Sequence, residues 1–356
     1  HDALPILFLI VPEQFTLEAE KQFIDQSDSA GFLGIEVVSF KRLAHKVFEE
    51  VGKPKGVKIS EMGQMMLLRK LFIQNQETLV LYKGMTNKYG FLEKCLDLIK
   101  ELKQNRITPE QLQVSLEKFE QHQVLKNKLN DISVIFKAYE LEKEKIYFDD
   151  EDFYGFLLDE IHHSDKLKNA KIWIDGFDSF TVQEMEIIQQ MALQVQEVTL
   201  TLCTDGLIQN GVFEHTDTFY QKLMTFAASQ ALSFEGVLFE RNNEAQFIQH
   251  VAENIMAYPY KKMTMTNDSV GVFVADNRLN EVEYCASKIV EFIRSGQYIW
   301  QDFAIITNAL DGYHMSIKRI FDEYKIPYFL DVKAQANHNP LVHLIQTYLE
   351  LYIDGF

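Results

Sequence analysis

The feature of this sequence that most constrains its fold is a pair of short apolar runs near the N-terminus, each followed by a helical pattern. Residues 6–11 are continuously apolar, as in a strand buried on both faces, and Pro12 ends the run. Thr16 can then N-cap a helix. Residues 35–40 repeat the apolar run before a helical pattern over residues 41–50. Two strand–helix units in succession predict a parallel sheet.

A long helical stretch separates these units from the next strands. Residues 60–163 show helical periodicity and little else, and strand patterns return at residues 171–175 and 198–203. We therefore predict one α/β domain over residues 1–59 and 164–265, split by an all-helical insertion.

A second α/β domain is predicted over residues 266–356. Strand patterns occur at residues 270–274, 303–306 and 326–329, with helical patterns between them. The sequence begins with His1 and not with Met. We therefore expect a piece of a longer protein, with the second domain cut short.

The net charge of −17 argues against a general nucleic-acid-binding surface. A field of that sign repels phosphate, so any contact with DNA must be local, in a channel whose own charge differs from the average. Taken alone, the charge favours a function that does not involve DNA.

Other bulk features predict a cytoplasmic protein without a membrane segment. No apolar run approaches the ~18 residues of a membrane span, and no basic region precedes the first apolar run as in a signal peptide. Cys95, Cys203 and Cys285 lie far apart in sequence. Their number and spacing fit neither a disulfide framework nor a metal knuckle.

The motif that cradles a triphosphate, G-x-x-x-x-G-K-[ST], does not occur in this sequence. The nearest basic glycine stretch, residues 52–56, has the wrong spacing and is predicted to be a loop. No series of backbone N–H groups for a nucleotide phosphate is therefore evident.

Asp175 follows a strand pattern and is followed by Gly176. A carboxylate at such a strand end can hold Mg²⁺ through water, as in P-loop enzymes, but Asp-Gly is also a common turn pair. The residues alone favour the turn. With Gly176 next to it, Asp175 has no adjacent carboxylate to orient a water molecule.

Three further groups of residues are weak candidates for metal sites. Residues 149–152 are all acidic, which fits a helix N-terminus better than a calcium loop. His162 with His163, and His250 with Glu253, have no third ligand nearby in sequence and are better explained as solvated helix faces. No nucleophile–base arrangement stands out, so we predict no catalytic residues and no metal ligands here.

Eight motifs, in their order along the chain, resemble those of the AddB/RexB family, which supplies one of the two subunits of the AddAB-type ATP-dependent helicase/deoxyribonuclease. They are residues 11–16 (VPEQFT), 39–44 (SFKRLA), 66–70 (MLLRK), 151–152 (ED), 175–177 (DGF), 180–184 (FTVQE), 326–331 (IPYFLD) and 338–341 (HNPL). The resemblance spans essentially the whole chain, and the motifs are specific as a set.

The resemblance implies a superfamily 1 helicase-like fold, in which a helical insertion splits the first parallel-sheet domain and a second α/β domain follows. In family terms the chain begins just past the phosphate loop and ends before the nuclease domain with its iron–sulfur cysteines. No cofactor is therefore expected in this chain, whereas Mg²⁺ and an iron–sulfur cluster are expected in the full-length protein.

The resemblance also implies a site for single-stranded DNA, formed by Gln14, Thr16, Phe40, Arg42 and Phe177. The family is thought to use an inactivated helicase half to scan the strand and recognise a Chi-like sequence. A sixth position, His45, stands where other members can carry Trp.

Two departures from an active helicase imply that this half does not turn over ATP. Asp175 matches the metal-binding Asp of the motor and is taken as a vestigial nucleotide and metal site, but Gly176 replaces the Glu that follows. Thr307 and Asn308 stand where active motors usually carry a phosphate-sensing Arg.

We therefore predict a module that binds and scans single-stranded DNA during double-strand-break repair by homologous recombination. It would work as a heterodimer with an AddA-type helicase–nuclease subunit, and without ATPase or nuclease activity of its own. The alternatives are an ATP-driven motor half of the intact subunit, a scaffold for the partner subunit, which the acidic surface suits, and an unrelated soluble α/β protein.

Overall fold

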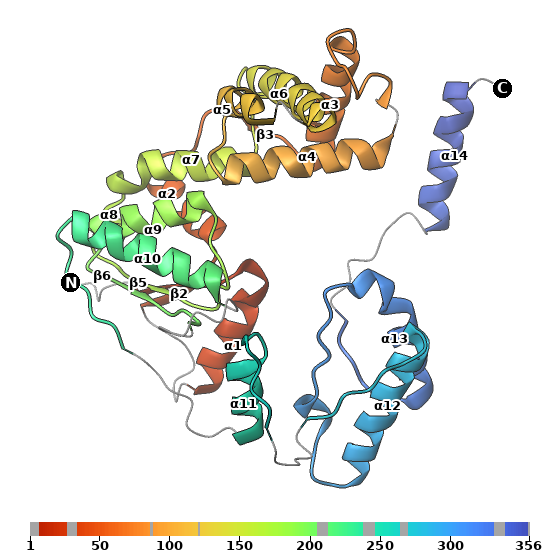
Figure 1. Cartoon of the computed structure of the whole chain (residues 1–356). Helices are drawn as coiled ribbons and strands as arrows, with labels where there is room; N and C mark the ends of the chain where they lie inside the picture. The colour runs from red at the N-terminus through yellow and green to blue at the C-terminus, as the bar shows by residue number, and fades with distance from the viewer. Residues whose placement is uncertain are drawn as a thin grey trace. The chain divides into compact units, whose positions relative to one another are not determined.

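The computed structural model describes residues 7–26, 34–85, 88–119, 122–204, 213–237, 246–263, 270–330 and 339–354. The chain forms two compact units (Figure 1). The first comprises His1–Asn243 and His250–Lys262, and the second comprises Glu244–Gln249 and Met263–Phe356. Each unit is described by itself.

A four-stranded parallel sheet lies at the centre of the first unit. Its strands β1 (Leu7–Ile10), β2 (Ile35–Val38), β5 (Lys171–Ile174) and β6 (Glu197–Leu200) lie in the order β2-β1-β5-β6. The prediction that the first, second and third apolar runs share one sheet is confirmed. Their apolar side chains explain this: Phe8, Ile10 and Ile172 on one face are almost fully buried. On the other face Leu9 is 6% exposed, whereas Trp173, in register with it, is 43% exposed.

Along the chain, the strands of the sheet alternate with or are followed by five main helices. They are α1 (Thr16–Gln26), α2 (Phe40–Val51), α7 (Asp150–Glu160), α9 (Val182–Gln194) and α10 (Glu214–Ser229). The starts of α2 and α9 follow from local sequence. Ser39 Oγ accepts the Arg42 N–H, and Thr181 and Glu184 form a capping box. Helix α7 packs against both α2 and α9, and these elements share one apolar core with the sheet.

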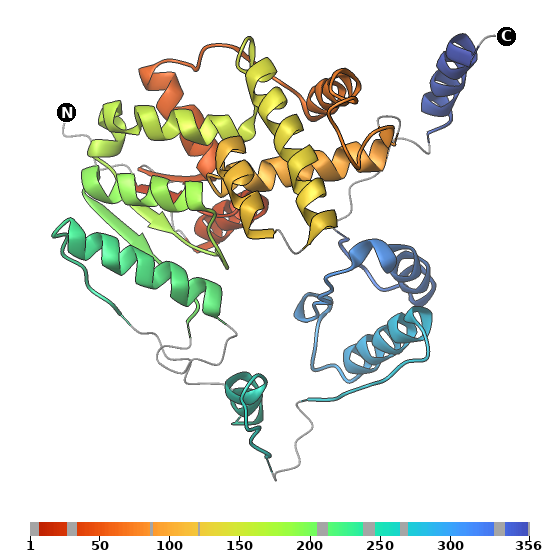
Figure 2. The same ribbon diagram turned by 45° about the horizontal axis from the view of Figure 1, so that its top comes forward.

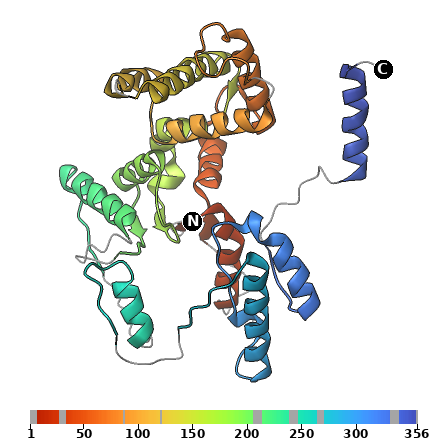
Figure 3. The ribbon, with the colours of Figure 1, turned by 45° about the vertical axis from the view of Figure 1, so that its right-hand side comes forward.

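A separate helical cluster lies between β2 and β5 in sequence. It contains α3 (Glu61–Gln74), α4 (Tyr89–Gln104), α5 (Pro109–Ser115), the short η3 (Leu116–Phe119) and α6 (Gln123–Lys143). It has its own core, which includes Leu68, Phe72, Ile99, Ile135 and Phe136. Figures 1 and 3 show it beside the sheet part of the unit, beyond α2 and α7.

A short parallel ribbon joins the cluster to the sheet part. Its strands are β3 (Val57–Lys58) and β4 (Tyr147–Phe148). After β4, α7 returns to the sheet core through Phe153 and Leu157, and η4 (Ile161–His163) and α8 (Asp165–Lys168) follow. The acidic residues 149–152 form the N-terminus of α7, as favoured from the sequence, with a capping box between Asp149 and Asp152.

In the second unit, α12 (Arg278–Arg294) and α13 (His314–Tyr324) pack against each other around Ala286, Ile320 and Phe321 (Figure 2). The other elements are η5 (Trp300–Asp302), η6 (Leu310–Gly312), α14 (Pro340–Asp354) and, across the boundary between the units, α11 (Gln246–Asn254).

The strands predicted at residues 270–274, 303–306 and 326–329 are not present in the part of the chain that the structure describes. Val272, Ile306 and Phe329 are 91%, 95% and 90% exposed. A strand requires a hydrogen-bonded neighbour as well as apolar residues, and an apolar run alone does not specify that neighbour. Among the described residues, no helix is both long enough and apolar enough to cross a membrane.

Candidate nucleic-acid interface at the carboxyl edge of the sheet

The loops that follow β1, β2 and β5 meet at one edge of the sheet. Ile10 is in register with Val38 and Ile174, so these three strands end at the same level. Val11 N–H donates to the Val38 carbonyl and Asp175 N–H to the Ile10 carbonyl, both at 3.0 Å. Ligands of open parallel sheets gather at this edge.

The first and third of these loops are in contact. A Cβ atom placed on Gly176 would lie 3.5 Å from Pro12 Cδ. Gly176 has φ +79°, a conformation that side chains other than glycine adopt at a cost. The backbone of this loop therefore favours a glycine at position 176.

Asp175 is exposed at this edge, and its Oδ1 accepts a hydrogen bond from the Thr201 hydroxyl, just beyond β6. One carboxylate oxygen is thus engaged. No group of three or more His, Cys, Asp or Glu side chains suited to a metal ion occurs within the described ranges.

Gln14 and Thr16 follow β1 but differ in exposure. Gln14 is exposed in the 3₁₀ turn η1 (Glu13–Phe15), whereas Thr16 is 3% exposed. The prediction that Thr16 N-caps the helix is wrong. Thr16 already has helical backbone angles, and its hydroxyl donates to the Glu13 carbonyl at 3.0 Å, because the 3₁₀ turn continues directly into α1.

The two phenylalanines of the predicted DNA site touch each other. Phe40 is 2% exposed and packs edge-on against Phe177, with 5.6 Å between ring centroids. Phe177 is half-buried and also stacks on Phe180 at 5.0 Å. Phe177 alone of this pair presents ring surface to solvent, and Phe40 supports it from the core.

Arg42 and His45 both lie on α2. The Arg42 side chain is 50% exposed, and its guanidinium lies 4.0 Å from a Glu20 carboxylate oxygen, a weak surface contact. His45 is exposed one turn further along, and its ring lies against Phe153 of α7, 4.7 Å between centroids. Arg42 is therefore near the first turn of α2, at the sheet edge, whereas His45 is further from it.

One aromatic residue at this edge was missed from the sequence. Phe15, next to Gln14 in the 3₁₀ turn, is 48% exposed. An aromatic residue three positions after the strand-ending Pro12 was the available signal. Gln14 and Arg42 can hydrogen-bond to base edges or phosphates, and Phe15 and Phe177 provide ring surface.

These features define an α/β protein of the helicase-like class. A parallel sheet carries the candidate site at its carboxyl edge, and a helical cluster is inserted between its second and third strands along the chain.

Comparisons with known proteins agree with that class and identify a family within it. The family model described as "ADDB, N-terminal" matches residues 2–252. Over 98% of its length, the chain is 35% identical to the B-type subunit of the ATP-dependent helicase/deoxyribonuclease of Alkaliphilus metalliredigens. It is 36% identical over 98% to the same subunit of Alkaliphilus oremlandii and 33% identical over 97% to that of Clostridium tetani.

The chain belongs to the AddB family, and the resemblance stated from its motifs is confirmed. It spans 31% of the length of each of these curated relatives.

Proposed function

We propose that this chain is the single-strand-binding part of the AddB subunit of a DNA-end-processing helicase–deoxyribonuclease. In this role it scans single-stranded DNA and recognises a Chi-like sequence during double-strand-break repair by homologous recombination. The names of the relatives supply the class of enzyme. The observation that supports the site is the meeting of three loops, distant in sequence, at one sheet edge, with Pro12 against Gly176.

Each candidate residue has a distinct proposed part. Gln14 and Arg42 contact base edges or phosphates, and the exposed surface of Phe177 stacks on a base. Phe40 and Thr16 act through neighbours, because both are buried: Phe40 holds the Phe177 ring, and the Thr16 hydroxyl closes the turn that presents Gln14. His45, against Phe153, lies at the margin of the proposed site.

The net charge of −17 limits this proposal to a local contact. Base stacking is insensitive to charge, so a site with one arginine and aromatic surface can retain a single strand when general phosphate attraction is absent. We expect binding with a shallow salt dependence for this reason.

ATP turnover by this chain is not part of the proposal. The sequence has no phosphate loop, Gly176 replaces the acid, and Asp175 bonds to Thr201. The residues do not fit an iron–sulfur cluster either, since three free cysteines occupy separate environments, with Cys95 buried and Cys203 exposed. Mg²⁺ and the cluster remain expectations for the rest of the full-length protein.

A scaffold for an AddA-type partner subunit is a second, compatible proposal. Its support is the exposed apolar surface of the second unit, where Val272, Ile306 and Phe329 are 91%, 95% and 90% exposed. Exposed apolar surface of this kind is a common feature of protein interfaces.

The test is a binding measurement on the full-length protein with its partner, using a strand that contains the recognised sequence and a scrambled strand. Retained discrimination that falls in Gln14→Ala, Arg42→Ala or Phe177→Ala supports the proposal. Unchanged discrimination in all three places the site elsewhere.

A further inference from the structure

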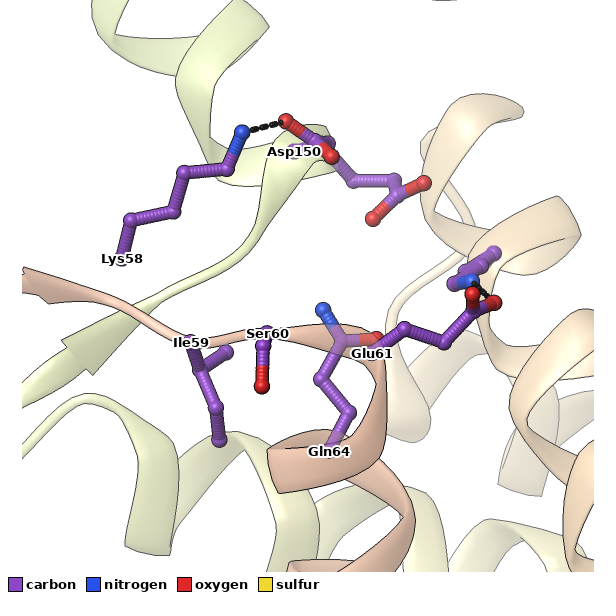
Figure 4. A pocket seen from close by; sticks show the side chains of 8 residues that line it. Lys58, Ile59, Ser60, Glu61, Gln64 and Asp150 are labelled. Atoms are coloured by element: carbon purple, nitrogen blue, oxygen red, sulfur yellow. Dashed lines mark hydrogen bonds and ion pairs between the residues drawn. The ribbon is translucent and has the colours of Figure 1, made fainter. Parts of the chain in front are cut away.

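A pocket that is chemically different from the proposed DNA site lies where the helical cluster meets the sheet part of the first unit. It has a volume of about 310 Å³. Its lining includes Lys58 from β3, Glu61 and Gln64 from α3, Lys100 from α4, and Asp150 and Glu151 from α7. Figure 4 shows these elements around the opening, with the Gln64 side chain reaching toward it from α3. None of these residues belongs to the proposed DNA site.

Two buried acceptor oxygens of this lining have no partner. Gln64 is 4% exposed and Glu151 is 6% exposed. Gln64 Oε1 and Glu151 Oε2 accept no hydrogen bond from any described protein group. The other Glu151 oxygen receives a long contact of 3.4 Å from Gln104 Nε2. Buried acceptors are normally satisfied, so two unpaired ones beside the same pocket point to a missing donor.

The charges around the pocket favour a cation. Lys58 pairs with Asp150, and Lys100 pairs with Glu61 at 2.7 Å, as the dashed lines in Figure 4 mark. Among the lining residues both ammonium groups are thus balanced by carboxylates, and Glu151 is the third carboxylate, so the lining itself carries one excess negative charge. Outside the lining, Lys41 also pairs with Asp150, at 3.3 Å. An anion would be repelled by the unpaired carboxylate oxygen.

Two other ligand types fit less well. The helix N-termini at the pocket do not need an anion, because Ser60 Oγ caps Gly63 N–H of α3 and Asp149 caps Asp152 N–H of α7. A metal ion is disfavoured, because the described part of the chain contains no cluster of His, Cys, Asp and Glu ligands suited to one. A group with N–H donors fits the amide and carboxylate oxygens directly.

We propose that this pocket binds a compact organic cation, a guanidinium or primary ammonium group, whose N–H groups donate to Gln64 Oε1 and Glu151 Oε2. The group can come from a free amine or from an arginine or lysine side chain of a polypeptide. Because Gln64 lies on α3 and Glu151 on α7, the bound cation would bridge the helical cluster and the sheet part.

The test uses the complete 356-residue chain and calorimetric titration. The probes are agmatine, as a free guanidinium and amine, and an N-acetyl-Gly-Arg-Gly-amide peptide, as a side chain. Tetramethylammonium, which is a cation without N–H donors, is the control ligand. Binding of agmatine alone assigns a free amine, and binding of the peptide assigns a side-chain ligand.

Two variants locate the bound probe. Glu151→Gln keeps the shape and removes the charge, and Gln64→Leu removes the acceptor. Each is expected to weaken binding about tenfold or more, as for loss of a hydrogen bond to a charged group. Glu93→Gln, on an exposed position of α4 outside the lining, should bind as the unsubstituted chain does.

Thermal unfolding establishes that each variant is folded before titration, and Gln64→Leu serves as the test if Glu151→Gln does not fold. The proposal is overturned if neither probe binds, if tetramethylammonium binds as tightly as agmatine, or if folded Glu151→Gln or Gln64→Leu retains full affinity.

Discussion

The ammonium group of Lys103 on α4 lies 2.6 Å from both carboxylate oxygens of Asp149, the N-cap residue of α7. Lys143 on α6 lies 3.0 Å from the same carboxylate, and the Lys103, Lys143 and Asp149 side chains are 9%, 1% and 2% exposed. Helices α4 and α6 belong to the helical cluster, whereas α7 packs on the sheet core. A buried ionic network therefore joins the two parts of the first unit.

Asp149→Asn is expected to destabilise the chain by about 1–3 kcal/mol, because two buried ammonium groups lose one of the three carboxylates that they share and keep Glu140 and Asp152. Asn is as good an N-cap as Asp, so the effect isolates the charge. Chemical denaturation monitored by circular dichroism measures it. Asp165→Asn is the matched control, since Asp165 pairs with Lys168 at the surface and is 80% exposed. Equal stability of Asp149→Asn and the unsubstituted chain would contradict this account of the network.

The same network predicts acid sensitivity. Burial by itself would raise the pKa of Asp149, but Lys103 and Lys143 outweigh it and hold that pKa well below its usual range. A carboxyl group with a depressed folded-state pKa contributes stability above its unfolded pKa of about 3.9 and loses it as the pH falls further. We expect the free energy of unfolding to decrease as the pH is lowered from about 5.

The free energy of unfolding should decrease less steeply with falling pH in Asp149→Asn than in the unsubstituted chain. Unfolding curves measured at a series of pH values from 7 into the acid range test this. Glu140 and Glu151, whose pKa values burial raises, contribute with the opposite sign. The Asp149 charge also raises the pKa of Glu151, so the difference between the two curves reports Asp149 together with its effect on these neighbours. Parallel curves would mean that Asp149 does not titrate as the geometry requires.

The parallel sheet was predictable because its strands are apolar on both faces. In β1, Phe8 and Ile10 on one face and Leu9 on the other are all buried, and the turn residues after each run locate the strand ends. From parallel strands alone, the meeting of the Pro12 and Gly176 loops at one edge also follows.

The exposure of individual site residues was not predictable. Phe40 and Phe177 have the same side chain and each follows a strand, yet only Phe177 reaches solvent, because Phe40 begins α2 with its ring toward the core. The pocket beside Gln64 and Glu151 was not predictable from the sequence either. Its residues come from separate elements, and no local sequence pattern specifies how these elements pack.

Substitutions of Gly176, in the loop after β5, test whether this glycine is required by the backbone conformation. Gly176→Ala and Gly176→Glu should each destabilise the chain by about 1–3 kcal/mol, because φ +79° is strained for both side chains. Gly236→Ala, in a described segment with no atom within 4 Å of the added Cβ, is the control and should change stability little.

Gly176→Glu is not expected to produce ATP hydrolysis, because the phosphate loop is missing from this sequence and Asp175 bonds to Thr201. A phosphate-release assay with and without single-stranded DNA measures it. DNA-stimulated release by the unsubstituted chain that disappears in Asp175→Ala would overturn the prediction of an inactive motor.

The last prediction concerns the DNA site in the full-length protein with its partner. Phe177→Ala should weaken single-strand binding by about 1–3 kcal/mol if a base rests on its exposed surface. Phe234→Ala is the control, as an exposed phenylalanine outside the three loops, at 62% exposure. Fluorescence anisotropy with a labelled strand, repeated at several salt concentrations, measures both.

Arg42→Ala distinguishes two uses of the guanidinium. If Arg42 contacts a base, the variant loses discrimination between the recognised and scrambled strands; if it holds a phosphate, discrimination remains and the salt slope of log K falls by about 0.7 on single strands. Glu20, at 4.0 Å, is too weakly paired to hold Arg42 away from either ligand. Arg319→Ala, on the exposed face of α13, should alter neither quantity. An Arg42→Ala variant with unchanged discrimination and unchanged slope would remove Arg42 from the site and leave Gln14 and Phe177 as its only tested contacts.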